Sequence, residues 1–220
     1  MTTPLVLGLD EELAQSIAAA IHGELLVQPN VDCQPNVDDD SVDWQWADPL
    51  EGWRTLANDG PNADQIVVAL FPEVSDPASL DAIDLASWVE RCEVSLARWI
   101  AALGVAQQRC ADGGTIVAIV DRVAPLDSAG RSAETSVSDA VEALVRSLAR
   151  SEGARGVRVN LVTTPARLTR LPVVDPQPPL KSFPGSIEGQ VISTCRMLLS
   201  DDAAALTSTV LHVDGGRSWR

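Results

Sequence analysis

Short aliphatic runs alternate with helical patterns along this chain, and this alternation constrains its fold more than any other feature. The runs lack polar alternation, which is typical of strands that are buried on both faces. Strands are predicted at residues 4–9, 24–27, 64–71, 115–120, 157–162 and 208–213, and helices at residues 11–22, 49–57, 85–110, 132–151 and 187–199. Because strand–helix–strand units form right-handed parallel pairs, the pattern predicts an α/β fold. We expect one doubly wound domain over residues 1–220, with a mostly parallel sheet and helices on both faces.

Two stretches interrupt the alternation. Residues 28–48 contain the sequence Gln-Pro-Asn-Val-Asp twice, and the second copy ends in a run of three aspartates, so an acidic irregular insert is predicted. Residues 164–185 contain six prolines and are predicted to form a loop. Neither stretch is expected to contribute a strand or a helix to the domain.

An excess of acidic residues limits the partners that this chain can bind. The 220 residues include 31 Asp and Glu against 16 Lys and Arg, a formal charge of −15. Nucleic acids and anionic membranes attract cationic surfaces, so neither is an expected partner. No stretch approaches the roughly 18 apolar residues of a membrane span. The N-terminus also lacks the basic and apolar regions of a signal peptide. We therefore expect an acidic cytoplasmic protein.

The four cysteines are too scattered to suggest a metal site. None belongs to a Cys-x-x-Cys pair or lies near a histidine cluster in the sequence, so no metal is expected. In a cytoplasmic protein they are expected to be reduced and mostly buried thiols. They are Cys33, Cys92, Cys110 and Cys195.

Several segments of the second half resemble one enzyme family. The chain closes with Leu-His-Val-Asp-Gly-Gly at residues 211–216, and residues 113–119, 139–149 and 156–160 carry further matching segments in the right order. Together they resemble the short-chain dehydrogenase/reductase (SDR) family, in particular its acyl-carrier-protein reductases. The resemblance is strong from about residue 64 onwards. It implies a Rossmann-like fold, a nicotinamide cofactor and a catalytic tetrad of Asn, Ser, Tyr and Lys.

The cofactor motifs of the family are degenerate in this chain. The family has three glycines where its first strand meets its first helix, and they let the pyrophosphate approach backbone N–H groups. Here only Gly8 is kept, and Glu12 and Ala14 stand at the other two positions. A carboxylate near 4 Å from a phosphate costs on the order of 1–4 kcal/mol. The family's Asn-Asn-Ala-Gly is replaced by Ala-Leu-Phe-Pro at residues 69–72. We therefore expect this chain to bind no nicotinamide cofactor.

The catalytic tetrad is also replaced. The resemblance aligns Ser95 with the family's Asn, Asp121 with its Ser, Glu134 with its Tyr and Ser138 with its Lys. The chain contains no tyrosine at all, so the proton donor of the family is absent. Glu134 and Ser138 are one helical turn apart, as the family's Tyr and Lys are, which supports this register. We expect no hydride transfer at a site of this chain's own.

The resulting hypothesis is a non-catalytic subunit. Family members commonly form dimers and tetramers through the helices predicted here at 85–110 and 132–151. Those helices could keep their role in assembly while the site decays. The partner is expected to be a catalytically intact homologous SDR that binds NAD(P), in a heterodimer or an α2β2 heterotetramer. Hydroxyacyl or ketoacyl thioesters are the expected substrates of the complex. Candidate interface residues are Trp88, Trp99, Leu144, Leu148 and Trp219.

Two alternatives remain open. In a repurposed enzyme, the carboxylates of Asp121 and Glu134 would form a general acid–base pair for lyase, hydratase or isomerase chemistry. The commoner explanation is that both are solvated acids in the cleft of an acidic protein. In a homo-oligomeric binding protein, the cleft would take a small ligand. Arg122, Arg131 and Arg167 could then meet an anionic acyl or CoA group, although scattered surface arginines are the commoner explanation.

Overall fold

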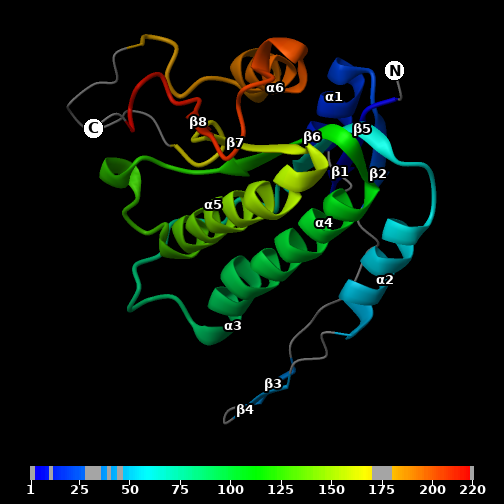
Figure 1. Cartoon of the computed structure of the whole chain (residues 1–220). Helices are drawn as coiled ribbons and strands as arrows, with labels where there is room; N and C mark the ends of the chain where they lie inside the picture. The colour runs from blue at the N-terminus through cyan, green and yellow to red at the C-terminus, as the bar shows by residue number, and fades with distance from the viewer. Residues whose placement is uncertain are drawn as a thin grey trace.

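One parallel sheet organises the molecule. The computed structural model describes residues 3–9, 12–27, 36–38, 41–43, 47–169 and 180–218. Within these residues the main sheet has the strand order β2-β1-β5-β6-β7-β8, with every pair parallel (Figure 1). The strands are β1 (Leu5–Gly8), β2 (Glu24–Val27), β5 (Ala63–Ala69), β6 (Cys110–Asp121), β7 (Arg158–Thr164) and β8 (Val210–His212). The predicted α/β fold with a doubly wound parallel sheet is confirmed.

Helices cover both faces of this sheet. In Figure 1, α2, α4 and α5 lie on one face, and α1 and α6 lie on the other. Their bounds are α1 (Glu12–Ile21), α2 (Ala47–Asn58), α4 (Ser95–Arg109), α5 (Ser132–Glu152) and α6 (Ile192–Leu199). None of the helices within the described ranges is long and apolar enough to cross a membrane.

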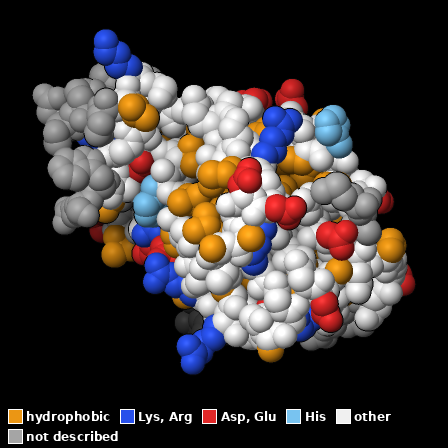
Figure 2. All heavy atoms as spheres, turned by 45° about the horizontal axis from the view of Figure 1, so that its top comes forward, with side chains coloured by type: hydrophobic (Ala, Val, Ile, Leu, Met, Phe, Trp, Pro, Cys, Tyr) orange, Lys and Arg blue, Asp and Glu red, His pale blue; other side chains and the backbone are white. Residues whose placement is uncertain are grey.

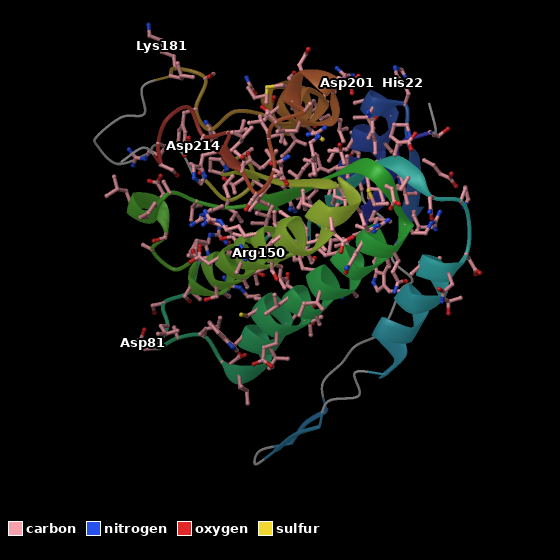
Figure 3. All side chains as sticks on the ribbon, viewed as in Figure 1. His22, Asp81, Arg150, Lys181, Asp201 and Asp214 are labelled. Atoms are coloured by element: carbon pink, nitrogen blue, oxygen red, sulfur yellow. The ribbon has the colours of Figure 1, made fainter. Side chains whose placement is uncertain are left out.

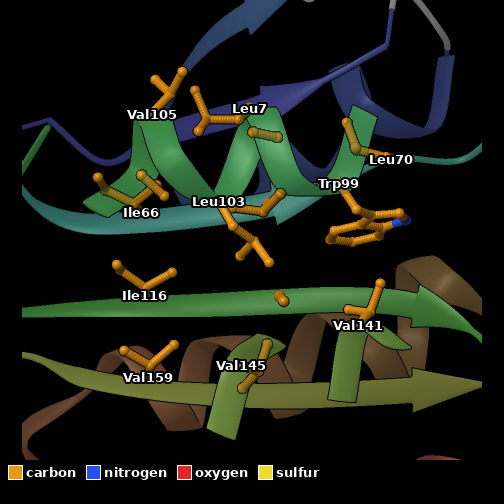
Figure 4. Packing of buried hydrophobic residues seen from close by; sticks show 14 of the residues in the cluster. Leu7, Ile66, Leu70, Trp99, Leu103, Val105, Ile116, Val141, Val145 and Val159 are labelled. Carbon is orange, nitrogen blue, oxygen red and sulfur yellow. The ribbon is translucent and has the colours of Figure 1, made fainter. Parts of the chain in front are cut away.

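The central strands are aliphatic throughout because each face packs on a helix layer. In β5, Ile66 and Val68 point into the core beneath α2, α4 and α5, whereas Val67 and Ala69 point into the core beneath α1 and α6. Figure 4 shows the first of these cores, where strand side chains such as Ile66 lie among residues of α4 and α5. Trp99 of α4 belongs to this core and is 1% exposed.

Two predicted helices are not continuous. The segment predicted at 85–110 begins with the short helix α3 (Leu85–Trp88), passes through the π-helical turn η1 (Val89–Val94) and continues as α4. The helix predicted at 187–199 likewise begins with a π-helical turn, η4 (Ile187–Val191), before α6. A π turn holds one residue more per turn than an α-helix, so the face that the chain presents changes within each segment.

The insert at 28–48 is more regular than predicted. Its described parts include β3 (Asn36–Asp38) and β4 (Ser41–Asp43), which pair antiparallel in a separate two-stranded sheet, and α2 already begins at Ala47. The prediction of an irregular insert is wrong for these segments. In the proline-rich stretch, Thr164 still belongs to β7, and residues 170–179 lie outside the described residues.

The strand order places a switch point beside β1. The chain runs from β1 to β2 on one side and then crosses to β5 on the other side. Gly8 ends β1 there, and a Cβ on Gly8 would lie only 2.7 Å from the Cβ of Ala14 in α1, so glycine allows the helix to approach the strand. Doubly wound sheets bind ligands at the carboxyl ends of their strands near such a point. The carboxyl edge is therefore where a site is expected.

The acidic character of the chain does not concentrate on the face seen in Figure 2. Asp and Glu side chains are spread over that face among hydrophobic and uncharged ones. Lys and Arg side chains also lie on that face, between acidic and hydrophobic ones.

Candidate functional site

The carboxyl edge of the sheet is hollowed in two adjoining places. The larger, which we call the edge cleft, has a volume of about 510 Å³. It lies between Leu9 after β1, residues 72–75 after β5, and the side chains of Glu90, Arg91, Arg98 and Glu134. The smaller, which we call the inner pocket, has a volume of about 40 Å³ and is lined by the buried residues Trp99 and Val137 among others.

Three of the four tetrad positions meet at the inner pocket. Ser95 from the first turn of α4, Asp121 from the end of β6 and Glu134 from the first turn of α5 all line it. Ser138 does not: its side chain is fully buried, and its hydroxyl donates to the Thr135 carbonyl at 2.9 Å. Three of the four residues that align with the tetrad therefore meet at one pocket, where they would face a substrate. The fourth, Ser138, lies outside it.

Glu134 is held by two arginines. Its Oε1 accepts hydrogen bonds from Arg91 of η1, at 2.7 Å from Nη2 and 3.2 Å from Nε. Arg131 Nη1 lies 3.5 Å from the same oxygen and donates to the Ser75 carbonyl at 2.6 Å. The Oε2 of Glu134 is buried and finds no hydrogen-bond partner within the described ranges. Glu134 therefore ties η1, α5 and the segment after β5 together.

Asp121 has an arginine of its own. Its Oδ2 accepts from Arg167 Nη1 at 2.6 Å, while Arg167 Nη2 donates to the Pro72 carbonyl at 2.7 Å. The Arg167 guanidinium also lies over the Phe71 ring, 5.1 Å from its centroid. Because each carboxylate has a separate counter-ion, the arrangement lacks the uncompensated repulsion that an acid–base dyad of Asp121 and Glu134 would need.

The three arginines predicted near the cleft mouth are all engaged within the chain. Arg131 and Arg167 lie at the edge, as described above. Arg122 instead contacts Glu142 at 2.6 Å and Asp139 at 2.8 Å, both on α5. Sequence reasoning missed Arg91 entirely, because nothing in the sequence marks a contact between residues that lie 43 positions apart.

The candidate interface residues have different environments. Trp99 is a core residue and has no surface to offer a partner, so its place among the interface candidates was wrong. Trp88, Leu144 and Leu148 are half-buried against the same core. Trp219 lies outside the described residues.

The described cysteines are not candidate nucleophiles. Cys92, Cys110 and Cys195 are free and buried. Burial raises the pKa of the Cys110 thiol to about 11 and that of Cys195 to about 12, so both are neutral near pH 7. Burial also raises the pKa of Cys92. No cluster of three or more metal-ligating side chains occurs among the residues that were described.

The turn after β8 is fixed by its own side chains. Asp214, labelled in Figure 3, accepts hydrogen bonds from the backbone N–H groups of Gly216 at 3.0 Å and Ser218 at 2.7 Å. Arg217 donates to both carboxylate oxygens of Asp127, at 2.8 and 2.9 Å. Asp127 belongs to η2 (Pro125–Asp127), so this turn is attached to the loop that follows β6.

Comparison with known proteins decides the family. Residues 67–218, well over half of the chain, match the family model described as enoyl-(acyl carrier protein) reductase. The chain belongs to the SDR family. A search of curated proteins found no sequence match.

Solved SDR structures share the fold at low sequence identity. The short-chain dehydrogenase/reductase from Serratia marcescens is 18% identical, with a TM-score of 0.68 over 99% of this chain and 97% of that one. The Plasmodium berghei enoyl-acyl-carrier-protein reductase, solved with triclosan, is 16% identical, with a TM-score of 0.69 over 100% and 98%. A blue fluorescent protein from a metagenomic library, solved with NADPH, is 16% identical, with a TM-score of 0.66 over 98% of each chain. At these identities the similarity establishes the fold.

The residues of this SDR chain do not fit a nicotinamide dinucleotide at the carboxyl edge. A pyrophosphate is bound by N–H groups at the start of the first helix, but α1 starts with the exposed carboxylate of Glu12. Phe71 stands where the family has Asn-Asn-Ala-Gly, and it is 1% exposed and belongs to the core beneath α1 and α6. No catalytic step through such a cofactor can be derived from these residues.

Proposed function

We propose that this SDR chain is a non-catalytic subunit that assembles with a catalytically intact homologous SDR. The complex would be a heterodimer or an α2β2 heterotetramer, and hydroxyacyl or ketoacyl thioesters would be its substrates. One observation carries the proposal: the positions of the family's Ser and Tyr hold Asp121 and Glu134, and arginines of this chain bind both carboxylates. Ion pairs within the chain have taken the place of groups that would face a substrate.

The residues at the family's cofactor-binding positions support the same proposal. A subunit that has Glu12 at the start of α1 and buried Phe71 after β5 would leave NAD(P) binding to its partner. Hydride transfer depends on the cofactor being placed against the substrate, so the chemistry of the complex would belong to the partner as well.

The outer surface of α4 and α5 supports assembly. The two helices lie side by side on one face of the sheet (Figure 1). Ile100 of α4 is 50% exposed, and a Cβ on Gly104, one turn later, would meet no atom within 4 Å. On α5, Ala143 is exposed and Leu144 half-buried. Apolar and small side chains at the outer surface of paired helices allow a second pair of helices to approach closely.

The first test is a tagged pull-down from the native host, with the co-purifying chain identified by mass. We expect a stoichiometric second SDR chain that retains the tyrosine, the lysine and the glycine-rich loop. That complex should reduce or oxidise an acyl thioester with NAD(P), whereas this chain alone should bind no nicotinamide cofactor. Recovery of this chain alone, or a complex whose activity is unchanged when this chain is removed, contradicts the proposal.

A matched pair of variants locates the interface. Ile100→Glu places a charge on the α4 surface, and Leu126→Glu places one on η2, where Leu126 is 55% exposed. Both variants should fold with nearly unchanged thermal stability, since both side chains are exposed. Ile100→Glu should lose the partner, because an unpaired charge would be buried, and Leu126→Glu should retain it. Equal retention by both variants would exclude the α4 surface as the interface.

A further inference from the structure

Three different groups surround the Arg167 guanidinium at the carboxyl edge. The Asp121 carboxylate at the end of β6 receives one N–H at 2.6 Å, and the Pro72 carbonyl receives another at 2.7 Å. The ring of Phe71 faces the cation at 5.1 Å. Phe71 and Pro72 directly follow Leu70 after β5, and Arg167 comes from the segment after β7, so three strand ends converge on one cation.

This set of groups is what recognition of a guanidinium requires. The carboxylate compensates the charge, the carbonyl accepts a second N–H from the same planar fork, and the aromatic face attracts the delocalised cation. The set is rigid, because Phe71 is fixed in the core beneath α1 and α6 and Asp121 continues a sheet strand. Asp121 and Arg167 side chains are 12% and 16% exposed, so water competes little for these contacts.

We propose that the carboxyl edge of the sheet contains a guanidinium-binding site, formed by Asp121, Pro72 and Phe71, which the chain fills with its own Arg167. Arg167 thus acts as an internal ligand at the edge where doubly wound sheets bind external ones. Removing its guanidinium would leave a site that accepts a small alkylguanidinium from solution. The site exists whether or not a partner subunit binds, so it does not depend on the proposed function.

A second arginine contact on the same side of the sheet shows the contrast. Arg122 also binds carboxylates, but Glu142 and Asp139 both come from α5, and the Asp139 side chain is 57% exposed. Without the arginine, nothing described would hold the exposed Asp139 carboxylate beside that of Glu142. Arg167 is different because its partners come from separate strand ends and keep their positions without it.

The inner pocket shows where an added molecule would enter. Pro72 and Asp121 line both the pocket and the Arg167 contact, and Leu168, next in the chain, lines the pocket as well. Truncating Arg167 would open space beside Pro72 and Asp121, which already line this pocket of about 40 Å³. A methylguanidinium ion has five heavy atoms, and ions of this size with well-placed contacts bind with Kd on the order of 1 mM.

The experiment compares Arg167→Ala with Arg146→Ala by thermal unfolding in methylguanidinium chloride from 0 to 20 mM. Arg146 is the matched control, because it is 57% exposed and pairs with Glu142 one turn away. Arg167→Ala should have a lower Tm than the unmodified protein, and methylguanidinium should raise that Tm along a saturable curve with a midpoint near 1 mM. Arg146→Ala and the unmodified protein should show no saturable rise. Methylammonium chloride should not raise the Tm of Arg167→Ala in this way, because an ammonium group lacks the planar fork of N–H donors.

Two outcomes would overturn the proposal. One is a Tm of Arg167→Ala that does not rise, and the other is an equal rise in Arg146→Ala. If Arg167→Ala is unfolded in buffer, the same titration followed by circular dichroism should show saturable refolding, and its absence is equally decisive. Arg167→Ala combined with Asp121→Asn should abolish the response, because the carboxylate is the anionic part of the site. The readout needs neither the partner nor a cofactor, so either proposal can fail without the other.

Discussion

Two arginines at the amino end of the parallel sheet, Arg158 and Arg109, have different partners from Arg91 and Arg167 at its carboxyl end. At the amino end, Arg158 at the start of β7 donates to the carbonyls of Leu198, Ala203 and Leu206 at 3.0–3.4 Å. Arg109 donates to the carbonyls of Leu56 and Asp59, where α2 ends. At the carboxyl end, Arg91 and Arg167 bind carboxylates. Burial lowers the pKa of Arg158, the direction expected for a cation surrounded by neutral dipoles.

The arginine–carbonyl contacts at the amino end follow from the fold, whereas the arginine–carboxylate contacts at the carboxyl end depend on the particular residues of this chain. In a doubly wound sheet, helix C-termini converge on the amino ends of strands and leave carbonyls without N–H partners. A cation there satisfies carbonyls that every such fold exposes. The carboxyl ends have no comparable need, because that edge normally serves a ligand. The arginines at the carboxyl edge therefore do not follow from the fold alone, because they pair with acids of this chain's own site.

Replacing Arg158 should have the largest effect. Arg158→Met keeps much of the side-chain volume but removes the charged donor that the Leu198, Ala203 and Leu206 carbonyls share, so the free energy of unfolding should fall by about 3 kcal/mol. The control is Arg150→Met near the end of α5 (Figure 3), because Arg150 is exposed and its loss should change stability by less than about 0.5 kcal/mol. Urea unfolding at pH 7 measures both, and similar values for the two variants would remove the distinction between the sheet ends.

The Arg91–Glu134 pair should have an intermediate effect that depends on which side chain remains. Arg91→Met or Glu134→Leu alone should cost about 2 kcal/mol. Glu134→Leu leaves the Arg91 guanidinium, 11% exposed, without its partner, and Arg91→Met leaves the Glu134 carboxylate, 18% exposed, with only the more distant Arg131 at 3.5 Å. The double variant should cost less than the sum, with a coupling energy of about 1–3 kcal/mol. A double-mutant cycle by urea unfolding checks this.

The control for that cycle is the longer and more exposed pair Arg98–Glu90, 3.7 Å apart with side chains 26% and 57% exposed, for which a coupling energy below about 0.5 kcal/mol is expected. If the Arg91–Glu134 coupling is no larger than that of this pair, the carboxyl edge is not held together by its ion pairs. The non-catalytic interpretation would then lose the observation that carries it.

The smallest expected effect is a pH dependence of the free energy of unfolding, caused by Glu152 at the amino end of the sheet. Burial by itself would raise the pKa of Glu152, but hydrogen bonds from Arg155, Gln107 and Ser151 together hold that pKa below its ordinary 4.5. The resulting stability is present above about pH 4.5, the unfolded value, and is lost as pH falls through the lower folded pKa.

The variant Glu152→Gln tests whether this contribution to stability is lost as pH falls. The variant should be less stable than the unmodified protein at pH 7 by about 1 kcal/mol, and the difference should shrink towards pH 3. Unfolding curves at several pH values measure it. A difference that grows as pH falls would mean that Glu152 is not stabilised as a carboxylate. Arg150→Met again serves as a variant whose difference should not depend on pH.

The sequence predicted the sheet well because its strands are buried on both faces. β1, β5 and β7 were found within two residues, since an unbroken aliphatic run is a clear signal. β6 begins at Cys110, before the predicted residue 115, because Asp112, Gly113 and Gly114 interrupt the aliphatic run. The π turn η1 was missed because one extra residue in a turn scarcely alters helical spacing over a long segment.

The site was predicted only in part for a related reason. Family spacing placed Ser95, Asp121 and Glu134 together, and the structure confirms that they line one pocket. Arg167 was named as a candidate at the cleft, but its pairing with Asp121 and the contact of Arg91 with Glu134 were not predicted, because they span 46 and 43 residues and long-range ion pairs leave no periodic signal. Helical spacing alone could not tell whether Trp99 is a core or an interface residue. Its 1% exposure in the structure places it in the core.

The strand order also has a consequence for synthesis on the ribosome. β1 and β2 emerge first, but the other neighbour of β1 is β5, and the central strand β6 follows only after α4. At roughly 5–20 residues per second, the ribosome needs on the order of 5–20 s to produce the chain as far as β6. Until β5 has been made, the aliphatic residues of β1 have only the short β2 beside them, and the far edge of β5 then stays unpaired until β6 follows. The nascent chain is therefore most exposed to aggregation and to chaperone binding before β6 is complete.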